Sequence, residues 1–457
     1  MRYKKSSYNV IIDELEGDRK LVYNTYSGSY GIMGKKMQEI YRNIENFNIE
    51  DISDERVLKS LNAMHTLGYI VDVEKDELIT IKLERAARRV HYSSLQLTIA
   101  PTMDCNMCCP YCYEDKKNFV MSDEIQEQLV NFIKTHFDRN TDVRMLSVVW
   151  YGGEPLLQKD IIYNLSKRFV DLCNEKEKMY KAAIITNGAL LDVETAKRLA
   201  EDCKVESVQI TIDGIKEMHN KRRILISGED SFDIITKNID AIKDILPINV
   251  RVNVDKENAE EMDTLVRFFI EEKNWKGRPS FSLSPVDIWE DSTCVTDKSL
   301  CLQGEEFAEV NLKSVRASYA ANRDDVVRRF FPRRRAIFCS GEGPFNYIID
   351  PEGYLYNCFV PIGKKEQSTG HVSKPFMATK EYGKWVLSDI PKRCESCEYL
   401  PLCMGGCGLL RIPNGGEPEC FHTSYTYKDL LKLAYEDYVI QQSKQITTAE
   451  MTSETVG

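Results

Sequence analysis

The sequence lacks any long apolar run, and this absence excludes a large class of protein. Nowhere in its 457 residues do eighteen apolar side chains follow one another, so no segment is suited to span a membrane. The first residues, MRYKKSSYNVIIDELEGD, carry acids where a secretory signal peptide has an apolar stretch. We therefore expect a chain that is not exported and a cytoplasmic location.

An excess of positive charge is also missing. The 61 Lys and Arg residues are outnumbered by 71 Asp and Glu residues, and the net charge of -10 argues against general affinity for nucleic acid. RRFFPRRR, residues 328–335, is a local exception, for which a solvated basic face and a contact with an anion or peptide are equally good interpretations. The length exceeds what one compact core usually holds, so two or three domains are expected.

Cysteine, in contrast, is abundant. The chain has 15 Cys, and because cytosolic thiols stay reduced, metal or cluster binding is favoured over a disulfide framework. Four of them lie in CNMCCPYCYE, residues 105–114, and seven more lie between Cys339 and Cys420. These two groups are the main candidates for chemistry.

Residues 1–90 have the pattern of a separate module. YNVIIDE and KLVYNTY are typical of strands, and ELEGDR between them is turn-prone. Two helical patterns follow, the second capped by Asp51 or Ser53 and ending at Gly68. YIVDV and LITIKL, separated by EKDE, then suggest a hairpin wing. The pattern predicts a winged-helix module.

Residues 91–300 alternate between strand and helix patterns. Six Val- and Ile-rich stretches, LQLTIA, MLSVVW, KAAIIT, SVQITI, VRVNV and SFSLSPV, are joined through helical segments. This predicts a parallel sheet, and the number of strands favours a partial (β/α)6 barrel over an open doubly wound sheet. Functional groups should collect at the carboxyl ends of the strands. There the sequence places the cysteine loop, Gly152-Gly153-Glu154, Thr186-Asn187-Gly188 and Asp213-Gly214.

The remaining chain is divided by composition. Residues 301–338 form a bridging region that includes a charged helical stretch. Residues 339–425 are rich in Gly, Pro and Cys and poor in periodic segments, so metal centres are expected to stand in for a core. Residues 426–457 are predicted to form a C-terminal helix and a polar tail, QQSKQITTAEMTSETVG, that is disordered.

The first cysteine group has the spacing C-x3-C-x2-C through Cys105, Cys109 and Cys112. Three thiolates on a short loop leave one iron of a four-iron cluster without a protein ligand, and that iron is open to a small molecule. A zinc knuckle is the rival interpretation, but zinc prefers a complete tetrahedron from paired motifs. Cys108, Cys173 and Cys203 are most simply explained as buried small hydrophobes.

This loop, at the end of the first strand, resembles that of the radical S-adenosylmethionine (radical SAM) superfamily over residues 95–300. YGGEP, TNG and IDGIKEMHNKRR resemble later segments of its cofactor pocket. The resemblance implies that S-adenosyl-L-methionine contacts Tyr111, Gly152, Gly153, Glu154, Asn187, Asp213 and Arg223. Arg223 matches by position a residue that meets the cofactor carboxylate in related peptide-modifying enzymes, and Arg251 and Asn253 lie on the next strand.

The second cysteine group reads C-x13-G-x4-C, then C-x2-C-x5-C-x3-C, then a last cysteine. It resembles the seven-cysteine SPASM domain, which implies two auxiliary clusters and three 4Fe-4S clusters in all. By position, the outer auxiliary cluster would be held by Cys394, Cys397, Cys403 and Cys420. The inner one would be held by Cys339, Cys358 and Cys407.

The inner cluster has only three ligands from the motif. We expect its fourth iron to be open to a substrate thiolate, with Cys294, Cys301 or a non-cysteine residue as the alternative ligand.

The resemblance also implies an activity. Radical SAM enzymes generate a 5′-deoxyadenosyl radical, SPASM members mostly act on peptides, and the N-terminal module resembles the leader-recognition element of enzymes that modify ribosomally made peptides. We expect a peptide maturase of the sactipeptide or ranthipeptide type, which forms thioether crosslinks. Its partners would be a Cys-containing precursor peptide, with the leader on the N-terminal module, and an electron donor such as flavodoxin or ferredoxin.

Three alternatives are kept. A carbon–carbon crosslinking or epimerising peptide maturase has the same architecture and is favoured by a fully ligated inner cluster. An anaerobic sulfatase maturase generally lacks the leader-binding module. A zinc-dependent DNA-binding regulator, built on the winged module, is opposed by the net charge of -10 and by two separate cysteine groups.

Overall fold

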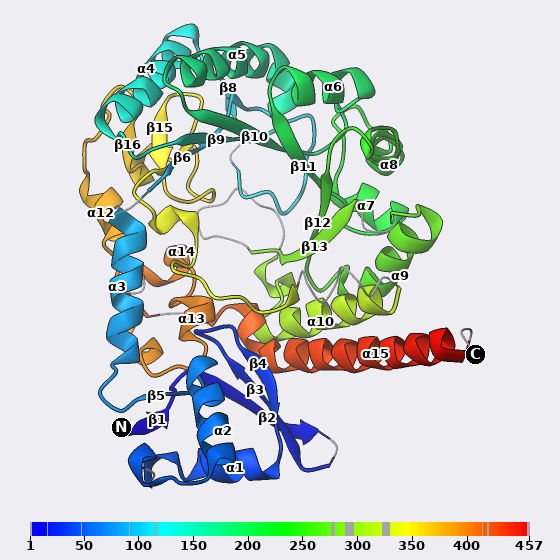
Figure 1. Ribbon diagram of the computed structural model, residues 1–457. Helices are drawn as coiled ribbons and strands as arrows, with labels where there is room; N and C mark the ends of the chain where they lie inside the picture. Colours follow the sequence, from blue (N-terminus) through cyan, green and yellow to red (C-terminus); the bar gives the residue numbers. More distant parts are fainter. Residues whose placement is uncertain are drawn as a thin grey trace. The chain divides into compact units, whose positions relative to one another are not determined.

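The computed structural model (Figure 1) describes residues 2–15, 17–46, 48–90, 92–114, 117–275, 279–287, 297–321, 330–413, 415–417 and 420–454. It divides into two compact units. The first comprises Met1–Arg88, Arg323–Phe338 and Asp389–Gly457, and the second comprises Arg89–Asn322 and Cys339–Ser388. Within the described residues, none of the helices combines the length and apolar composition needed to cross a bilayer.

The second unit is built on a sheet of six parallel strands. They are β6 (Ser94–Ile99), β9 (Met145–Trp150), β10 (Met179–Thr186), β11 (Val205–Thr211), β12 (Ile248–Val254) and β13 (Ser280–Pro285). They lie side by side in the order β13-β12-β11-β10-β9-β6. The predicted mixed α/β fold with a parallel sheet is therefore confirmed.

Three further strands extend this sheet beyond β6. β14 (Asn346–Ile349) pairs with β6 in parallel, and β15 (Tyr354–Tyr356) and β16 (Gly370–His371) follow in antiparallel pairing. They come from the cysteine-rich segment and have only four, three and two residues, too few for a periodic signal in the sequence. Chain from the expected SPASM segment thus completes the sheet that carries the cysteine loop.

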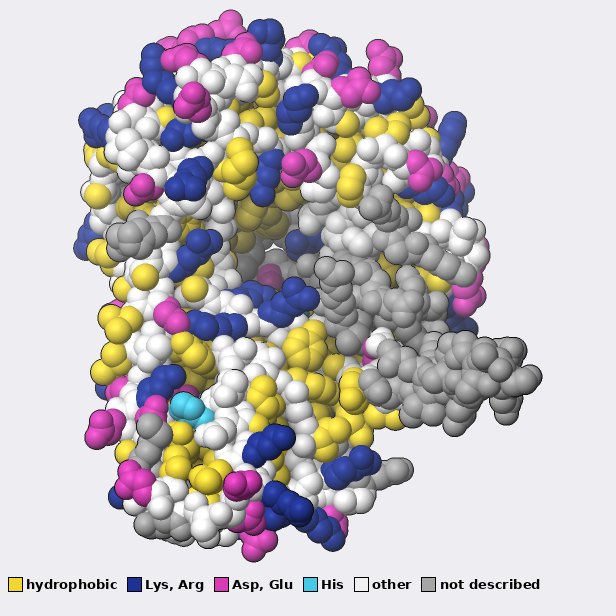
Figure 2. Space-filling view, viewed as in Figure 1, with side chains coloured by type: hydrophobic (Ala, Val, Ile, Leu, Met, Phe, Trp, Pro, Cys, Tyr) yellow, Lys and Arg dark blue, Asp and Glu magenta, His cyan; other side chains and the backbone are white. Residues whose placement is uncertain are grey.

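Helices cover the outer face of the curved sheet, as Figure 1 shows. The main ones are α4 (Asp123–Arg139), α5 (Lys159–Glu175), α6 (Val193–Glu201) and α8 (Ser231–Ile242). Smaller elements are β7 (Thr102–Met103), β8 (Lys117–Val120), α7 (Lys216–Arg222), α9 (Met262–Arg267), the π-helix η5 (Phe268–Glu272), α10 (Gly304–Ala321) and α12 (Lys380–Val386). On the face shown in Figure 2, acidic and basic side chains are interspersed over this unit.

Strand alternation separates the core from the site. On β12, Val250, Val252 and Val254 are fully buried, whereas Arg251 and Asn253 are half-buried on the opposite face. Cys173 and Cys203 are buried, as predicted. Cys108 is exposed, so the prediction that it is buried is wrong.

In the first unit, β2 (Asn9–Leu15), β3 (Arg19–Asn24) and β4 (Tyr30–Met33) form an antiparallel sheet in that order. β1 (Tyr3–Lys5) pairs separately with β5 (Ile70–Asp72). The two predicted helices are α1 (Lys35–Arg42) and α2 (Glu55–Thr66). The N-cap of α2 is Asp54, which accepts hydrogen bonds from the backbone N–H groups of Arg56 and Val57, so Asp51 and Ser53 were wrong predictions.

The predicted hairpin wing is also wrong, because LITIKL lies in the helix α3 (Glu77–Val90). Ile81 is buried, while Ile79 and Leu83 are 54% and 65% exposed, which is a helical rather than an alternating pattern. The Asp76 carboxylate accepts the backbone N–H of Ile79 at 2.9 Å and caps the helix. The β-branched residues of this short run made strand and helix hard to separate by sequence.

The C-terminal part of the first unit contains short helices and one long one. They are α13 (Leu400–Cys403), α14 (Gly408–Arg411) and α15 (Tyr427–Glu454). The α15 helix extends into the segment for which the sequence predicts disorder. Of the basic stretch, Arg334 pairs with Glu84 and lies over the ring of Tyr26, which is a packing contact within this unit; residues 328 and 329 lie outside the described residues.

Candidate functional site

The three-cysteine loop follows β6 and is held in place by main-chain bonds. The carboxylate of Asp104 accepts the N–H of Cys105 at 2.9 Å, and the N–H of Cys112 donates to the carbonyl of Cys109 at 3.2 Å. The backbone of residues 106–108 pairs with residues 224–226, with N–H···O distances of 2.8 and 2.9 Å. All three candidate thiols are half-buried, so one short loop presents them together.

Gly152 and Gly153, after β9, are required by close packing against the start of this loop. Gly152 has a φ of +117°, and a Cβ on it would lie 2.3 Å from the carbonyl oxygen of Thr102. A Cβ on Gly153 would lie 2.3 Å from the carbonyl oxygen of Asp104. Any side chain at either position would displace the residues that lead into Cys105.

Glu154 joins three strand ends. Its buried carboxylate accepts the Thr186 hydroxyl at 2.7 Å and the Asn187 N–H at 2.8 Å. Asn187 in turn donates its side-chain amide to Asn106, in the cysteine loop, at 2.7 Å. Burial raises the pKa of Glu154, and the hydrogen bonds that it accepts oppose that rise. The Gly-Gly-Glu and Thr-Asn-Gly segments therefore meet the loop, as the sequence predicted for strand ends.

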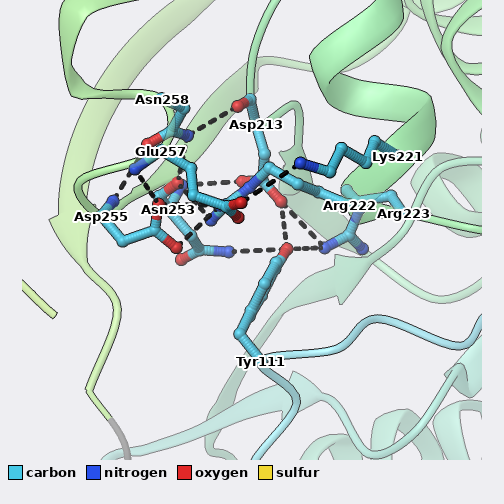
Figure 3. A network of polar contacts seen from close by, with 9 residues as sticks. All are labelled: Tyr111, Asp213, Lys221, Arg222, Arg223, Asn253, Asp255, Glu257 and Asn258. Carbon is cyan, nitrogen blue, oxygen red and sulfur yellow. Dashed lines mark hydrogen bonds and ion pairs between the residues drawn. The ribbon is translucent and has the colours of Figure 1, made fainter. Parts of the chain in front are cut away.

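Tyr111 connects the loop to the next strand ends (Figure 3). Its hydroxyl donates to the Asp213 carboxylate and accepts from Arg223 Nη1 at 2.8 Å. Asp213 is fully buried, and its other oxygen accepts the N–H of Asn253 at 2.8 Å. Burial and the nearby Asp213 carboxylate raise the pKa of Tyr111, which keeps the phenol protonated as a donor.

The sequence did not single out Arg222 or Asp255, which form the buried centre of this network (Figure 3). Arg222 Nη1 lies 2.8 and 2.7 Å from the two oxygens of Asp255, and the side chains are 2% and 1% exposed. The guanidinium also lies over the Tyr111 ring, 4.9 Å from its centroid. The segment HNKRR contains both arginines, but only Arg223 matched the position of a residue with a known role in related enzymes.

A second missed group lies beside Cys112. The hydroxyls of Tyr113 and Tyr151 are hydrogen-bonded to each other. The Tyr151 ring packs edge-on against the Phe359 ring, with 4.9 Å between the ring centroids. Burial raises the pKa of the neighbouring Glu114 to about 7. Phe359 directly follows Cys358, so these rings connect the loop to the chain around an expected auxiliary ligand.

The donor groups of the loop fit a metal cluster. Burial raises the pKa of the Cys105 and Cys112 thiols to about 12, and a bound metal centre would displace their protons and hold them as thiolates. Beside the loop, Arg223 Nε is buried without a hydrogen-bond partner among the described residues, which suits a carboxylate ligand.

The downstream cysteines fall into both units. In the first unit, burial raises the pKa of Cys394, Cys397 and Cys403, and the nearby charge of Cys420 raises each of the three further. Cys407, in the same unit, precedes α14. Cys339 and Cys358 belong to the second unit. Cys301 follows a short 3-10 helix, Lys298–Leu300, and Cys294 lies outside the described residues.

In the described part of the chain, no three His, Cys, Asp or Glu side chains converge closely enough for one metal ion.

Comparison with known proteins identifies the domain that carries the loop. Residues 99–269 match the family model described as Radical SAM superfamily. On the basis of this match, residues 99–269 are called the radical SAM domain, and the matched family implies a 4Fe-4S cluster and S-adenosylmethionine.

Two curated relatives are sulfatase-maturating enzymes. The chain is 24% identical to the cysteine-type anaerobic sulfatase-maturating enzyme of Clostridium perfringens (strain 13), over 75% of this chain and 96% of the relative. It is 29% identical to the serine-type enzyme of Bacteroides thetaiotaomicron, over 69% of this chain and 83% of the relative.

Two solved structures share the fold at lower identity. Native anSMEcpe with bound AdoMet aligns with a TM-score of 0.58 at 20% identity, covering 77% of this chain and 99% of its own. Streptococcus suis SuiB bound to S-adenosylmethionine aligns with a TM-score of 0.51 at 17% identity, covering 92% and 98%.

Proposed function

We propose that this chain, with its radical SAM domain, is a maturase that forms thioether crosslinks in a ribosomally made precursor peptide. The observation that carries the proposal is a regular, open strand edge on the N-terminal sheet of a chain that also presents the three-cysteine loop. SuiB, solved also in a complex with precursor peptide SuiA, aligns over 92% of this chain in that complex, with a TM-score of 0.50. The match includes more of the chain than the 77% that aligns with anSMEcpe.

The chain's own groups then have distinct tasks. Cys105, Cys109 and Cys112 hold the cluster, and Arg223 and the strand ends bind and orient the cofactor. Bound at that cluster, S-adenosyl-L-methionine supplies a 5′-deoxyadenosyl radical when an electron donor provides one electron. Crosslinking removes two hydrogens from the peptide: a carbon loses one as a hydrogen atom, the thiol loses the other as a proton, and an auxiliary cluster held by the downstream cysteines would supply an acceptor for the remaining electron.

The auxiliary ligands remain as the sequence suggests. A Cβ on Gly341 would lie 2.2 Å from the carbonyl oxygen of Asn357, and Asn357 Nδ2 donates to the Gly341 carbonyl at 2.7 Å. The chain beside Cys339 is thus packed on the chain beside Cys358, which supports a cluster shared by these two cysteines. An open iron there would bind a precursor thiolate.

The edge strand β4 is suited to receive the leader. Asn24 N–H donates to the Ser29 carbonyl at 2.9 Å, so alternation along the β3–β4 ladder directs the main-chain groups of Tyr30 and Ile32 outward. The other edge strand, β2, has a register shift between Ile12 and Leu15, and such bulges discourage pairing. A leader can therefore add alongside β4, with main-chain bonds giving affinity.

Ile32→Pro should weaken leader binding by about tenfold, because it removes one outward N–H while the β3–β4 ladder loses no bond. Fluorescence anisotropy with labelled precursor peptide measures the dissociation constant. Ile32→Ala is the matched control, since it keeps the N–H, and it should bind within about twofold of the parent chain. If the proline variant and the parent chain bind the precursor peptide with equal affinity, β4 is not the strand that binds the leader. A deletion of residues 1–90 is a poorer test, because it would strip the apolar partners of α13 and α15.

Mass spectrometry of a precursor peptide co-expressed with the full chain tests the product. A loss of two hydrogens per crosslink, with thiols that no longer react with iodoacetamide, is expected for thioethers. The same mass loss with reactive thiols would instead establish carbon–carbon bonds.

A second candidate function has one observation in its favour, the 24% identity to sulfatase-maturating enzymes. Conversion of a peptide Cys or Ser to an aldehyde that reacts with a hydrazide probe would establish it and overturn the thioether proposal.

A further inference from the structure

The N-terminal module and the outer-cluster segment share hydrophobic cores within the first unit. Tyr8 and Ile81 pack with Leu400 and Met404, and Cys394 contacts the same cluster of side chains. Leu400 and Met404 are each 1% exposed. The segment that carries the outer cysteines is therefore buried against the module rather than attached to it by a linker.

A second core lies on one face of the β2–β3–β4 sheet. Leu21 and Tyr23 of β3 pack with Leu402 of α13 and with Leu431 of α15. The opposite face of the sheet packs on α1 and α2 through Val22. The sheet is thus the middle layer of this unit, and loss of order in the outer-cluster segment would uncover one of its faces.

Polar contacts reach the loop between the outer cysteines. The Thr25 hydroxyl, at the end of β3, donates to the carbonyl of Glu398 at 2.6 Å. Lys82 of α3 pairs with Glu395 at 2.6 Å. Glu395 lies between Cys394 and Cys397, and Glu398 directly follows Cys397. The module therefore contacts the main chain whose shape the outer cysteines would set.

This segment has little regular structure of its own. The helices α13 and α14 have four residues each, far fewer than an isolated helix needs to be stable in water. Between them Met404 has a φ of +52°, and Gly405 and Gly406 have φ values of +90° and +80°. Such a chain depends on cross-links and packing, and metal binding then contributes directly to folding.

We propose that the outer cluster crosslinks its own segment and thereby orders the N-terminal sheet, so that loading of this cluster with iron controls binding of the precursor peptide. The regulation rests on the proposed function, since it concerns the same peptide. Because coupling between two sites is reciprocal, bound peptide must also protect the outer cluster against loss of iron.

The test compares two full-length variants, each without one cluster. Cys397→Ala removes an outer ligand, and Cys112→Ala removes a ligand of the loop in the other unit. In Cys397→Ala, hydrogen exchange of residues 9–33 should rise and the affinity for labelled precursor should fall by about tenfold. Cys112→Ala should leave both measurements within about twofold of the parent. If hydrogen exchange of residues 9–33 in Cys397→Ala is the same as in the parent chain, the proposal that the outer cluster orders the sheet is wrong.

A folding control keeps this outcome interpretable. Uncoupled 5′-deoxyadenosine formation by Cys397→Ala reports that the radical SAM domain is intact. Thr25→Val leaves every cysteine in place and removes the hydroxyl that donates to the Glu398 carbonyl at 2.6 Å and to the Tyr8 carbonyl at 3.2 Å. It should raise the exchange of residues 19–33 by about threefold. If exchange in both variants matches the parent, the module does not depend on the outer segment.

The reciprocal measurement uses the parent chain and a chelator. The iron of the outer cluster is identified as the four iron atoms per chain that Cys397→Ala lacks. A saturating concentration of precursor peptide should slow the transfer of these four iron atoms to bathophenanthroline. An unchanged rate with bound peptide would refute the coupling. If no peptide binds the parent, the proposed substrate is wrong, and the exchange experiment still decides whether the outer cluster orders the sheet.

Discussion

Alanine at Cys105, Cys109 or Cys112 is expected to abolish reductive cleavage of S-adenosyl-L-methionine. The loop has three half-buried thiols, and removing one would leave only two ligands for the proposed cluster, in which three cysteines already leave one iron open. Loss of residues that only support a metal ligand costs 10–100-fold, so loss of a ligand itself should reduce the rate by at least about a hundredfold. Chromatography of 5′-deoxyadenosine formed with dithionite under anaerobic conditions measures the effect.

The same loop supplies a matched control. Cys108 is exposed, and its N–H bonds to the carbonyl of Ile224 without any need for the thiol. Cys108→Ala should therefore retain full cleavage and a full complement of iron. Sustained 5′-deoxyadenosine formation in Cys112→Ala, or its loss in Cys108→Ala, would show that the ligands have been assigned wrongly.

Asp255→Ala should destabilise the radical SAM domain more than any surface substitution. It leaves the guanidinium of Arg222, which is 2% exposed, without the carboxylate that lies 2.7 Å from it. Breaking a buried pair on one side costs about 3–5 kcal/mol, because the remaining charge keeps only a weaker partner, here Glu257 at 3.6 Å. The loss of stability is measured as the shift in the midpoint of urea unfolding, with hydrogen exchange in β11 and β12 as the signal that reports unfolding.

Two controls separate charge from shape. Asp171→Ala breaks the exposed pair with Lys167, whose side chains are 61% and 78% exposed, and should cost at most about 1 kcal/mol. The double variant Arg222→Met/Asp255→Leu removes both charges and should recover most of the stability, since a buried pair is often replaceable by apolar groups. If the double variant were as unstable as Asp255→Ala, packing over Tyr111 rather than charge would be the cause.

The sequence predicted the part of the fold that depends on hydrophobic patterning. Six parallel strands and the polar residues at their ends follow from runs such as VRVNV, in which Val250 and Val252 face the helices while Arg251 faces the site. The cysteine spacings marked the loop. These signals are local, so a single sequence is enough to read them.

The sequence could not predict what depends on distant partners. β14 is four residues long and has strand form because it pairs with β6. LITIKL became a helix because its capping residue and inward face outweighed β-branched composition. Arg222 and Asp255 are 33 positions apart and meet only when the strand ends are assembled. The strand form of β14 and the Arg222–Asp255 pair are decided by tertiary packing, not by local propensity, whereas the Asp76 cap of α3 is a local signal that the sequence prediction missed.

The first unit also sets the order in which the chain can fold during synthesis. The Tyr30 hydroxyl donates to the carbonyl of Leu431, which is 401 positions later. At bacterial rates the ribosome needs roughly 20–80 s to make the intervening chain. Throughout that time Leu21 and Tyr23 have no partner from α13 or α15, so the nascent sheet presents an uncovered apolar face to the cell. Leu431 must be synthesised before the first unit can close, whereas the radical SAM strands can already associate.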